Sequence, residues 1–323
     1  MMIAAVLHGI GEPIQIEERT SLHASPGHQV VRLKYAAINH RDLWIQQGKY
    51  AGLRFPIVLG SDGMGQVDQR DVLIQPGLDW GTHQTHQERS YRILGLPDDG
   101  TFATEVVVPQ GNVFSVPGHL SPEEAAALPL AGLTAYRAVM VKAEVSSGEK
   151  VLVTGIGGGV ATLAMQMALA QGAEVYVTSG SVEKINQAKS MGVAEGFVYK
   201  NPEWSDQLKN MTGGIHKIID GTGGQGFSEA IDCLSPGGIA VNYGGTAGDF
   251  TLAPRRLFWN QLTLKGTTMG TERDFADMLS FVHQHRIHPV VAAVFPLDQI
   301  NEAFNFIRSR SQFGKVVLAI PGL

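Results

Sequence analysis

The sequence predicts an α/β protein that joins an antiparallel β domain to a second domain built on a doubly wound parallel sheet. In its N-terminal third, short apolar runs such as residues 30–38 and 102–109 are separated by Gly, Pro and Asp, which is typical of antiparallel strands. From Ser121 onward, strand-like and helix-like runs alternate, and this alternation predicts parallel strands with helices on both faces. A glycine cluster stands at the first strand-to-helix turn of that alternation.

The elements of the second domain can be justified in order. Ser121, followed by Pro and two glutamates, has the pattern of an N-cap and a first helical turn. Apolar runs then predict strands at 151–155, 174–180, 216–223, 239–245 and 262–270, and helices at 161–172, 182–192 and 228–238. The C-terminal part returns to a mixed pattern, with helices expected at 274–285 and 298–310 and strands at 290–297 and 315–320.

Composition favours a small-molecule partner. The net charge of −5 over 323 residues is spread along the chain, so we expect neither nucleic acid nor an anionic membrane as a partner. Residues 151–173 are uncharged over the length of a membrane span, but the glycines divide them into a strand and a helix. A single cysteine, Cys233, and an N-terminus without a basic region before its apolar stretch predict a cytoplasmic protein rather than an exported one.

The glycine cluster predicts a nucleotide site. After the strand at 151–154 come Gly155, Gly157, Gly158 and Gly159, followed by Val160 and a helix-like run. Glycines let backbone amides approach a pyrophosphate, and the helix N-terminus adds positive potential. A tight packing turn is the alternative, but the strand before and the helix and strand after favour a dinucleotide.

The end of the next strand indicates which dinucleotide. An NAD site should place a carboxylate there to accept the ribose hydroxyls, whereas this strand ends in Ser179, Gly180 and Ser181, with Lys184 one turn into the helix. Hydroxyl groups and an ammonium suit a 2′-phosphate, so we expect NADPH. The alternative is that Lys184 is a solvated helix residue.

Several motifs together resemble the medium-chain dehydrogenase/reductase superfamily, and within it the quinone oxidoreductase-like and zinc-type alcohol dehydrogenase-like branches. They are AAINHRDLWIQQGKY (36–50), PIVLGSDGMGQV (56–67), PLAGLTAY (129–136), GIGGGVA (155–161), LTLKGTTMG (262–270) and FGKVVL (313–318). The resemblance implies a GroES-like catalytic domain (1–119), a Rossmann NADP-binding domain (120–270) and a return segment (271–323), with the active site in a cleft between the domains. It also implies a homodimer formed through the strand within 262–269.

Zinc members of the superfamily hold a catalytic ion with Cys, His and acidic ligands. By the resemblance, their places are taken here by Asn39, by Ser61 followed by Asp62, and by Leu130. Thiolate and imidazole are both missing, and a lone carboxylate does not make a three-ligand catalytic zinc site. We therefore expect no catalytic metal.

The stretch DWGTHQTHQ (79–87) matches the region in which zinc members have a lobe with four cysteines. Trp80, His83 and His86 stand in the first three places, and the shortened loop leaves the fourth without a counterpart. A closed structural zinc site needs four nitrogen or sulfur ligands. We expect a lobe that has lost its metal, with Trp80 packing in its place.

Loss of zinc removes the Lewis acid that alcohol oxidation would use. Hydride transfer to a quinone or an α,β-unsaturated carbonyl needs less, because the charge moves to an oxygen that hydrogen bonds stabilise. Such a reductase is the leading hypothesis. Two alternatives stay open, a zinc-type alcohol dehydrogenase with unrecognised ligands and an NADPH-binding sensor or structural protein without turnover.

The candidate site residues follow from these motifs. Asn39 and His40 are candidates for polarising the substrate oxygen, Arg41 is expected to reach a cofactor phosphate or a carboxylate, and Asp42 to hold the loop. Thr134 and Tyr50 are expected to line the site, with Trp44, Phe258 and Trp259 as aromatic candidates for a substrate pocket. By the resemblance, Tyr199 meets the adenosine portion of NADPH, and the ribose and nicotinamide are approached by Gly244, Gly245, Thr268, Met269 and Gly270.

Overall fold

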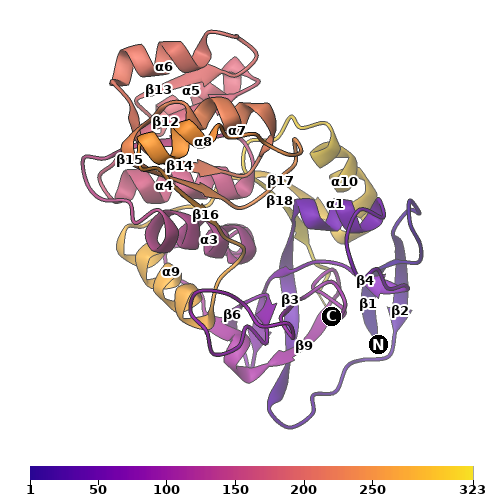
Figure 1. The fold of residues 1–323 in the computed structure, drawn as a ribbon. Helices are drawn as coiled ribbons and strands as arrows, with labels where there is room; N and C mark the ends of the chain where they lie inside the picture. Colours follow the sequence, from indigo (N-terminus) through magenta and orange to yellow (C-terminus); the bar gives the residue numbers. More distant parts are fainter. Residues whose placement is uncertain (323) are drawn as a thin grey trace. The chain divides into compact units, whose positions relative to one another are not determined.

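The chain folds into two compact units in the computed structural model, which describes residues 1–322 (Figure 1). Unit 1 comprises Met1–Leu133 together with the chain from Gly270 onward, and unit 2 comprises Thr134–Met269. The predicted combination of antiparallel β structure with a parallel α/β sheet is confirmed.

Unit 1 is built on β-sheets. One sheet has the strand order β2-β1-β4, a larger one has the order β10-β6-β5-β3-β18-β17 with β9 also paired to β3, and β7 pairs with β8. The strands are β1 (Met2–Leu7), β2 (Gln15–Arg19), β3 (His28–Ile38), β4 (Ile57–Val58), β5 (Asp62–Val67), β6 (Arg70–Ile74), β7 (Gly77–Leu78), β8 (Arg92–Ile93), β9 (Glu105–Pro109), β10 (Val113–Ser115), β17 (Val291–Pro296) and β18 (Lys315–Ala319).

The C-terminal segment completes unit 1. Strand β18 pairs antiparallel with β3, and β17 pairs in parallel with β18. The buried face of α10, including Ile300 and Phe304, joins the hydrophobic core formed by β1, β3 and their neighbours. The helices of unit 1 are α1 (His40–Gln46), α2 (Pro122–Ala126), α9 (Glu272–Gln284) and α10 (Ile300–Arg308), with short 3₁₀ turns η1 (Gln110–Asn112) and η3 (Leu297–Gln299).

Unit 2 is a six-stranded parallel sheet with the order β13-β12-β11-β14-β15-β16. This is the strand order of dinucleotide-binding domains, whose ligands lie beyond the carboxyl ends of the strands. The strands are β11 (Lys150–Val153), β12 (Glu174–Ser179), β13 (Glu195–Val198), β14 (Ile215–Asp220), β15 (Leu234–Asn242) and β16 (Thr263–Gly266). The helices are α4 (Gly159–Ala170), α5 (Val182–Ser190), α6 (Trp204–Thr212), α7 (Gly224–Ile231) and α8 (Pro254–Trp259).

Helix α3 (Pro129–Tyr136) crosses from unit 1 into unit 2 and continues as the π-helix η2 (Arg137–Lys142). The change of unit at Leu133 falls later than the boundary expected at 119/120, because α2 lies against β3 and β5 and so belongs to unit 1. In residues 1–322 no helix combines the length and the apolar character that crossing a membrane requires.

The element between β14 and β16 differs from the prediction. The helix expected at 228–238 is α7, which already begins at Gly224 and ends at Ile231, and β15 already begins at Leu234. Leu234 pairs with Ile215, and the register then shifts so that Ile239 pairs with Lys217. The Ser-Pro-Gly-Gly run is therefore an irregularity inside a strand rather than the end of a helix.

Candidate active site

The glycine cluster forms an open turn between β11 and α4. Gly155 and Gly157 have φ values of +63° and +131°, which L side chains rarely adopt. A Cβ added to Gly158, the N-cap of α4, would meet no atom within 4 Å. Backbone N–H groups at such a helix end bind phosphate well. The turn, which runs into Gly159 and Val160, thus has the open form that a pyrophosphate requires.

Polar side chains gather at the carboxyl end of β12. A Cβ added to Gly157 would lie 3.1 Å from Lys184 Nζ, so this lysine runs along the glycine turn. A Cβ added to Gly180 would lie 2.6 Å from Tyr199 Oη and 3.5 Å from Lys200 Cε. Tyr199 is half exposed. Lys200 was missed in the sequence, where its only signal was its place directly after Tyr199.

The same corner contains a carboxylate that the sequence reasoning left out. Ser181 is the N-cap of α5, and its hydroxyl donates to Glu183 Oε2 at 2.5 Å, which holds the pKa of Glu183 below its usual range. Ser179 is buried, with its hydroxyl 3.4 Å from the carbonyl oxygen of Ile156. The strand itself ends without an acid as expected, yet the next helical turn presents one.

A buried carboxylate, Asp220, ties together the strand ends around the glycine turn. It stands at the end of β14 and is fully buried. Its hydrogen-bond donors are Thr154 Oγ1, the backbone N–H groups of Thr222 and Gly223, and Asn242 Nδ2. They follow three neighbouring strands, β11, β14 and β15. Asp220 was not among the residues predicted from the sequence, where its only signal was a single acid at the end of an apolar strand.

The loops after β15 and β16 contain the remaining predicted cofactor residues. A Cβ added to Gly244 would lie 2.7 Å from a backbone carbonyl oxygen, so only glycine fits there. Thr134 and Met269 are both buried, and Thr134 Oγ1 lies 3.8 Å from Met269 Sδ. Thr268 is exposed, and Gly270 begins the second part of unit 1.

In unit 1, a buried polar cluster forms where the zinc ligands of the superfamily would stand. Lys315 Nζ donates to Asn39 Oδ1 at 2.6 Å and to Asp62 Oδ2 at 2.8 Å. Asn39 Nδ2 donates to the same carboxylate oxygen at 2.9 Å, and the backbone N–H of Leu130 donates to Asp62 Oδ1 at 2.7 Å. Ser61 Oγ donates to a backbone carbonyl oxygen at 2.8 Å. The four residues at the three catalytic ligand positions of zinc members are therefore all engaged within the protein.

Asp42 and His40 flank this cluster on α1. Asp42 Oδ2 accepts from the backbone N–H of Asn39 at 2.7 Å and so holds the loop as expected. Burial raises the pKa of Asp42 to about 6 against the opposing charge of Arg41. Although the imidazole of His40 is accessible to solvent, its pKa is lowered by desolvation and then by the charges of Lys315 and Arg310. We therefore regard His40 as a neutral ring that can donate a hydrogen bond.

Arg41 corrects an expectation from the sequence. Its guanidinium is buried in unit 1, where Nη1 donates to Ser61 Oγ and to the carbonyl oxygen of Leu94, both at 2.7 Å, and it lies 5.2 Å from the ring centre of Tyr50. These contacts hold neighbouring loops together. Arg41 is therefore no part of the cofactor site that we propose below.

The aromatic candidates fall into two groups. Trp44 is half-buried, with its ring 6.3 Å from that of His40, and Tyr50 packs against the core of unit 1. Phe258 and Trp259, on α8 of unit 2, are 65% and 73% exposed. Trp44 and Tyr50 thus stay candidates for substrate contact, whereas Phe258 lies on a surface that has another interpretation, given below.

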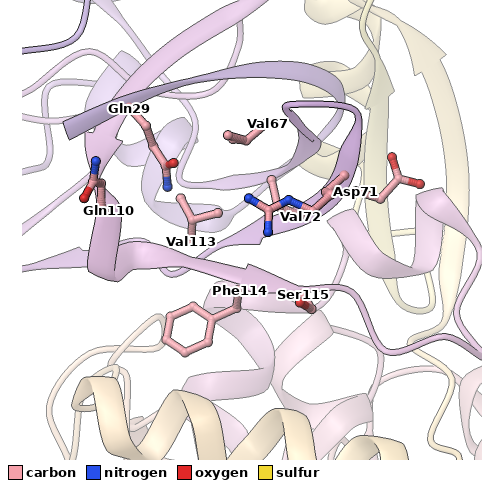
Figure 2. Close-up of a pocket in the computed structure, with 9 residues that line it drawn as sticks. Gln29, Val67, Asp71, Val72, Gln110, Val113, Phe114 and Ser115 are labelled. Carbon is pink, nitrogen blue, oxygen red and sulfur yellow. The ribbon is translucent and has the colours of Figure 1, made fainter. Parts of the chain in front are cut away.

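A half-open hollow of about 300 Å³ lies on the sheet of unit 1 (Figure 2). Its walls include Gln29, Val72, Gln110 and Ser115, which are largely polar and come from β3, β6 and the β9–β10 region. None of the predicted site residues lines it. We therefore place no substrate there.

Zinc members of the superfamily bind the metal at a catalytic site and in a separate lobe. The residues at neither of these two places fit zinc in this protein. Asn39 and Asp62 are both hydrogen-bonded to the Lys315 ammonium. Within residues 1–322, no group of three or more His, Cys, Asp or Glu side chains is arranged to hold a metal ion. A zinc site needs such a set.

The former metal lobe is closed by an aromatic side chain. Trp80 is buried, its Nε1 donates to the carbonyl oxygen of His83 at 2.8 Å, and its ring meets Tyr91 edge-on at 5.1 Å. His83 and His86 are exposed and stack on each other with ring centres 4.7 Å apart. Trp80 is thus packed within this lobe, while the two histidines lie on its surface.

Known proteins resemble the chain in both sequence and structure. Residues 25–118 match the alcohol dehydrogenase GroES-like domain, and residues 159–284 match the zinc-binding dehydrogenase family. A zinc-type alcohol dehydrogenase-like protein of Schizosaccharomyces pombe is 35% identical over 92% of both chains. An acryloyl-coenzyme A reductase of Sulfurisphaera tokodaii is 27% identical over 98% of this chain and 99% of its own.

Solved structures give the same assignment. The crystal structure of an NAD-dependent alcohol dehydrogenase has a TM-score of 0.93 at 35% identity, covering 99% of this chain and 100% of its own. The quinone oxidoreductase of Thermus thermophilus, solved alone and with NADPH, has a TM-score of 0.83 at 28% identity, covering 98% and 99%. The chain has a GroES-like domain and a parallel six-stranded sheet, and a relative matches it over 92% of both chains. It therefore belongs to the medium-chain dehydrogenase/reductase superfamily of oxidoreductases.

Proposed function

We propose that this oxidoreductase uses NADPH, without zinc, to reduce a quinone or an α,β-unsaturated carbonyl compound. The observation that supports this most directly is the polar cluster in unit 1, where Asn39 and Asp62 stand at positions of the catalytic metal ligands and are hydrogen-bonded to each other and to the Lys315 ammonium. A site without a Lewis acid suits substrates whose own conjugation spreads the developing negative charge.

The reaction needs little from the protein beyond placement and hydrogen bonds. NADPH, when bound, would supply a hydride, and the acceptor would be the β-carbon of an enone or a quinone ring. The electrons of the conjugated system then move to the carbonyl oxygen, and a proton from solvent completes the product. Asn39 and His40 are the donors that we assign to that oxygen, because both belong to the cluster or border it and both can donate an N–H group. Thr134, Trp44 and Tyr50 would line the site.

We propose NADPH rather than NADH as the cofactor because of the side chains at the end of β12. Lys184 and Lys200 would neutralise a 2′-phosphate, the Ser181 hydroxyl would contact it, and Tyr199 would lie against the adenosine. Ser179, also expected at this site, is buried with its hydroxyl against the carbonyl oxygen of Ile156, so we do not assign it to the phosphate. The negative charge of Glu183 would repel a 2′-phosphate, and the two positive charges of Lys184 and Lys200 outweigh this repulsion. Related structures are described with either cofactor, so the choice has to rest on this corner. The glycine turn, Gly244, Thr268, Met269 and Gly270 would contact the rest of the cofactor through their backbones.

Steady-state kinetics test this function. The purified protein is assayed with NADPH and with NADH against 1,4-benzoquinone, 9,10-phenanthrenequinone and a short enone, first in EDTA and then with added zinc. NADPH oxidation that EDTA does not affect is the expected result. Activity only with zinc, or only with simple alcohols, would identify a zinc-type alcohol dehydrogenase instead. Tight NADPH binding with no turnover of any acceptor would favour a sensor or structural protein.

We also propose that two copies of the chain form a homodimer in a reducing compartment such as the cytoplasm. Strand β16 is one of the two edge strands of the parallel sheet, and α8, which precedes it in the chain, exposes Leu257, Phe258 and Trp259. A sheet edge next to exposed apolar side chains invites pairing with a second chain. The only cysteine, Cys233, is buried, and burial raises the pKa of its thiol to about 12, so it has no redox role in this proposal.

A further inference from the structure

Lys315 is a buried cation with a complete set of partners. Its side chain is 5% exposed, and its ammonium donates to the carbonyl oxygen of Ile38 at 2.9 Å as well as to Asn39 Oδ1 and Asp62 Oδ2. An ammonium has three N–H donors, so all of them are used. Lys315 lies on β18 and Asp62 on β5, and both strands pair with β3. Three adjacent strands therefore bring the ammonium and the carboxylate together. The cation is therefore held in one place.

The two charged partners determine which way the Asn39 amide faces. Lys315 Nζ can only donate and it contacts both side chains, so Asn39 Oδ1 must face the lysine and Nδ2 must face the Asp62 oxygen that accepts from Lys315. A flipped amide would turn its N–H groups toward the ammonium and its oxygen toward the carboxylate. This orientation is set by chemistry and is independent of how an amide is assigned in coordinates.

One N–H group of Asn39 has only a long hydrogen bond within the protein. Of its two amide hydrogens, one is used by Asp62 at 2.9 Å, and the other has only a contact of 3.5 Å with the carbonyl oxygen of Ala37. Such a contact is longer than an ordinary hydrogen bond. We propose that Lys315 and Asp62 are positioning residues that hold Asn39 so that this second N–H group meets the substrate carbonyl oxygen. The inference rests on the function proposed above.

The test separates position from stability. Lys315→Met alone leaves the buried Asp62 carboxylate without its counter-charge, which is strongly destabilising. The double variant Lys315→Met with Asp62→Asn removes both charges and keeps an oxygen for the backbone N–H of Leu130. We expect the double variant to recover most of the Tm that the single variant loses, and to bind NADPH within about twofold of wild type. Its kcat with the enone should fall at least about tenfold, because a hydrogen-bond donor to the substrate oxygen is no longer oriented.

Two further variants complete the design. Lys34→Met with Asp71→Asn removes an exposed Lys–Asp pair in the same unit, at 2.9 Å, and should change neither kcat nor Tm appreciably. Lys315→Arg keeps the positive charge beside Asn39 and should retain more kcat than the double variant at similar Tm. Wild-type kcat in the folded double variant would overturn this inference alone, and so would a Lys315→Arg kcat as low as that of the double variant at equal Tm. A wild-type enzyme without turnover of quinone or enone would overturn the proposed function, and this inference with it.

Discussion

At the scale of single residues, cofactor choice rests on the charges at the end of β12. Lys184 lies along the glycine turn and Lys200 beside Gly180. Replacing Lys184 with Ala should raise the Kd of NADPH by about tenfold or more, since a charge-assisted hydrogen bond is lost, and should change the Kd of NADH less than twofold. Quenching of protein fluorescence by each cofactor would measure both constants.

Glu183 provides the opposite test at the same corner. Its carboxylate accepts from Ser181 at the start of α5 and would repel a 2′-phosphate. Glu183→Gln should therefore strengthen NADPH binding modestly and leave NADH unchanged. If Lys184→Ala weakens the binding of NADPH and NADH equally, or if Glu183→Gln weakens NADPH binding, then the 2′-phosphate does not bind at this corner.

Asp42 predicts a pH dependence of stability. Burial raises its pKa from 3.8 to about 6, so between these values the folded state holds a proton that the unfolded state has lost. The stabilising contribution is therefore complete below pH 3.8 and disappears as the pH rises through 6. The free energy of unfolding of wild type relative to Asp42→Asn should fall by roughly 2 kcal/mol between about pH 4 and pH 7. Urea unfolding of both proteins across that range measures it, and a constant difference would mean that Asp42 ionises normally.

At the scale of elements, the lobe around β7 and β8 depends on Trp80 rather than on a metal. Trp80→Ala removes a buried ring and its contact with Tyr91, and should cost about 3 kcal/mol of unfolding free energy. The exposed pair His83→Ala with His86→Ala serves as the matched control and should cost less than about 0.5 kcal/mol. Thermal unfolding with EDTA and with zinc measures both. If zinc raises the Tm of wild type but not that of the histidine double variant, then this lobe binds zinc.

The elements that could be predicted have local signals. The strand and helix on either side of Gly155 were found because an uncharged run is divided by glycines, and the helix at 122 because Ser and Pro precede two glutamates. The start of β15 could not be found, because Pro236 and the glycines after it look like a helix end, whereas they form a bulge that only pairing with β14 reveals. Pairing with a distant strand overrides local turn chemistry.

At the scale of the whole molecule, the candidate site could be predicted only in part. The cofactor turn is a contiguous motif and can be read directly. The Lys315 cluster joins residues 38–39, 62 and 315 through strand pairing, and a lysine in a terminal apolar strand gives no sign of its partners. Arg41 shows the same limit in the other direction, since its neighbours in sequence indicated a ligand and its neighbours in space are carbonyl oxygens.

The surface of a single chain also predicts how copies of the protein assemble. With β16 at the end of the sheet and Phe258 and Trp259 exposed on α8, the wild-type protein should elute as a dimer of twice 34.7 kDa. Trp259→Asp places a charge in the apolar contact and should shift the dimer toward monomer at micromolar concentration. Met211→Asp, on α6, changes an equally apolar side chain that is 57% exposed and should leave the dimer intact. Size-exclusion chromatography with light scattering distinguishes these results, and a monomeric wild type, or a dimer lost only in Met211→Asp, would place the interface elsewhere.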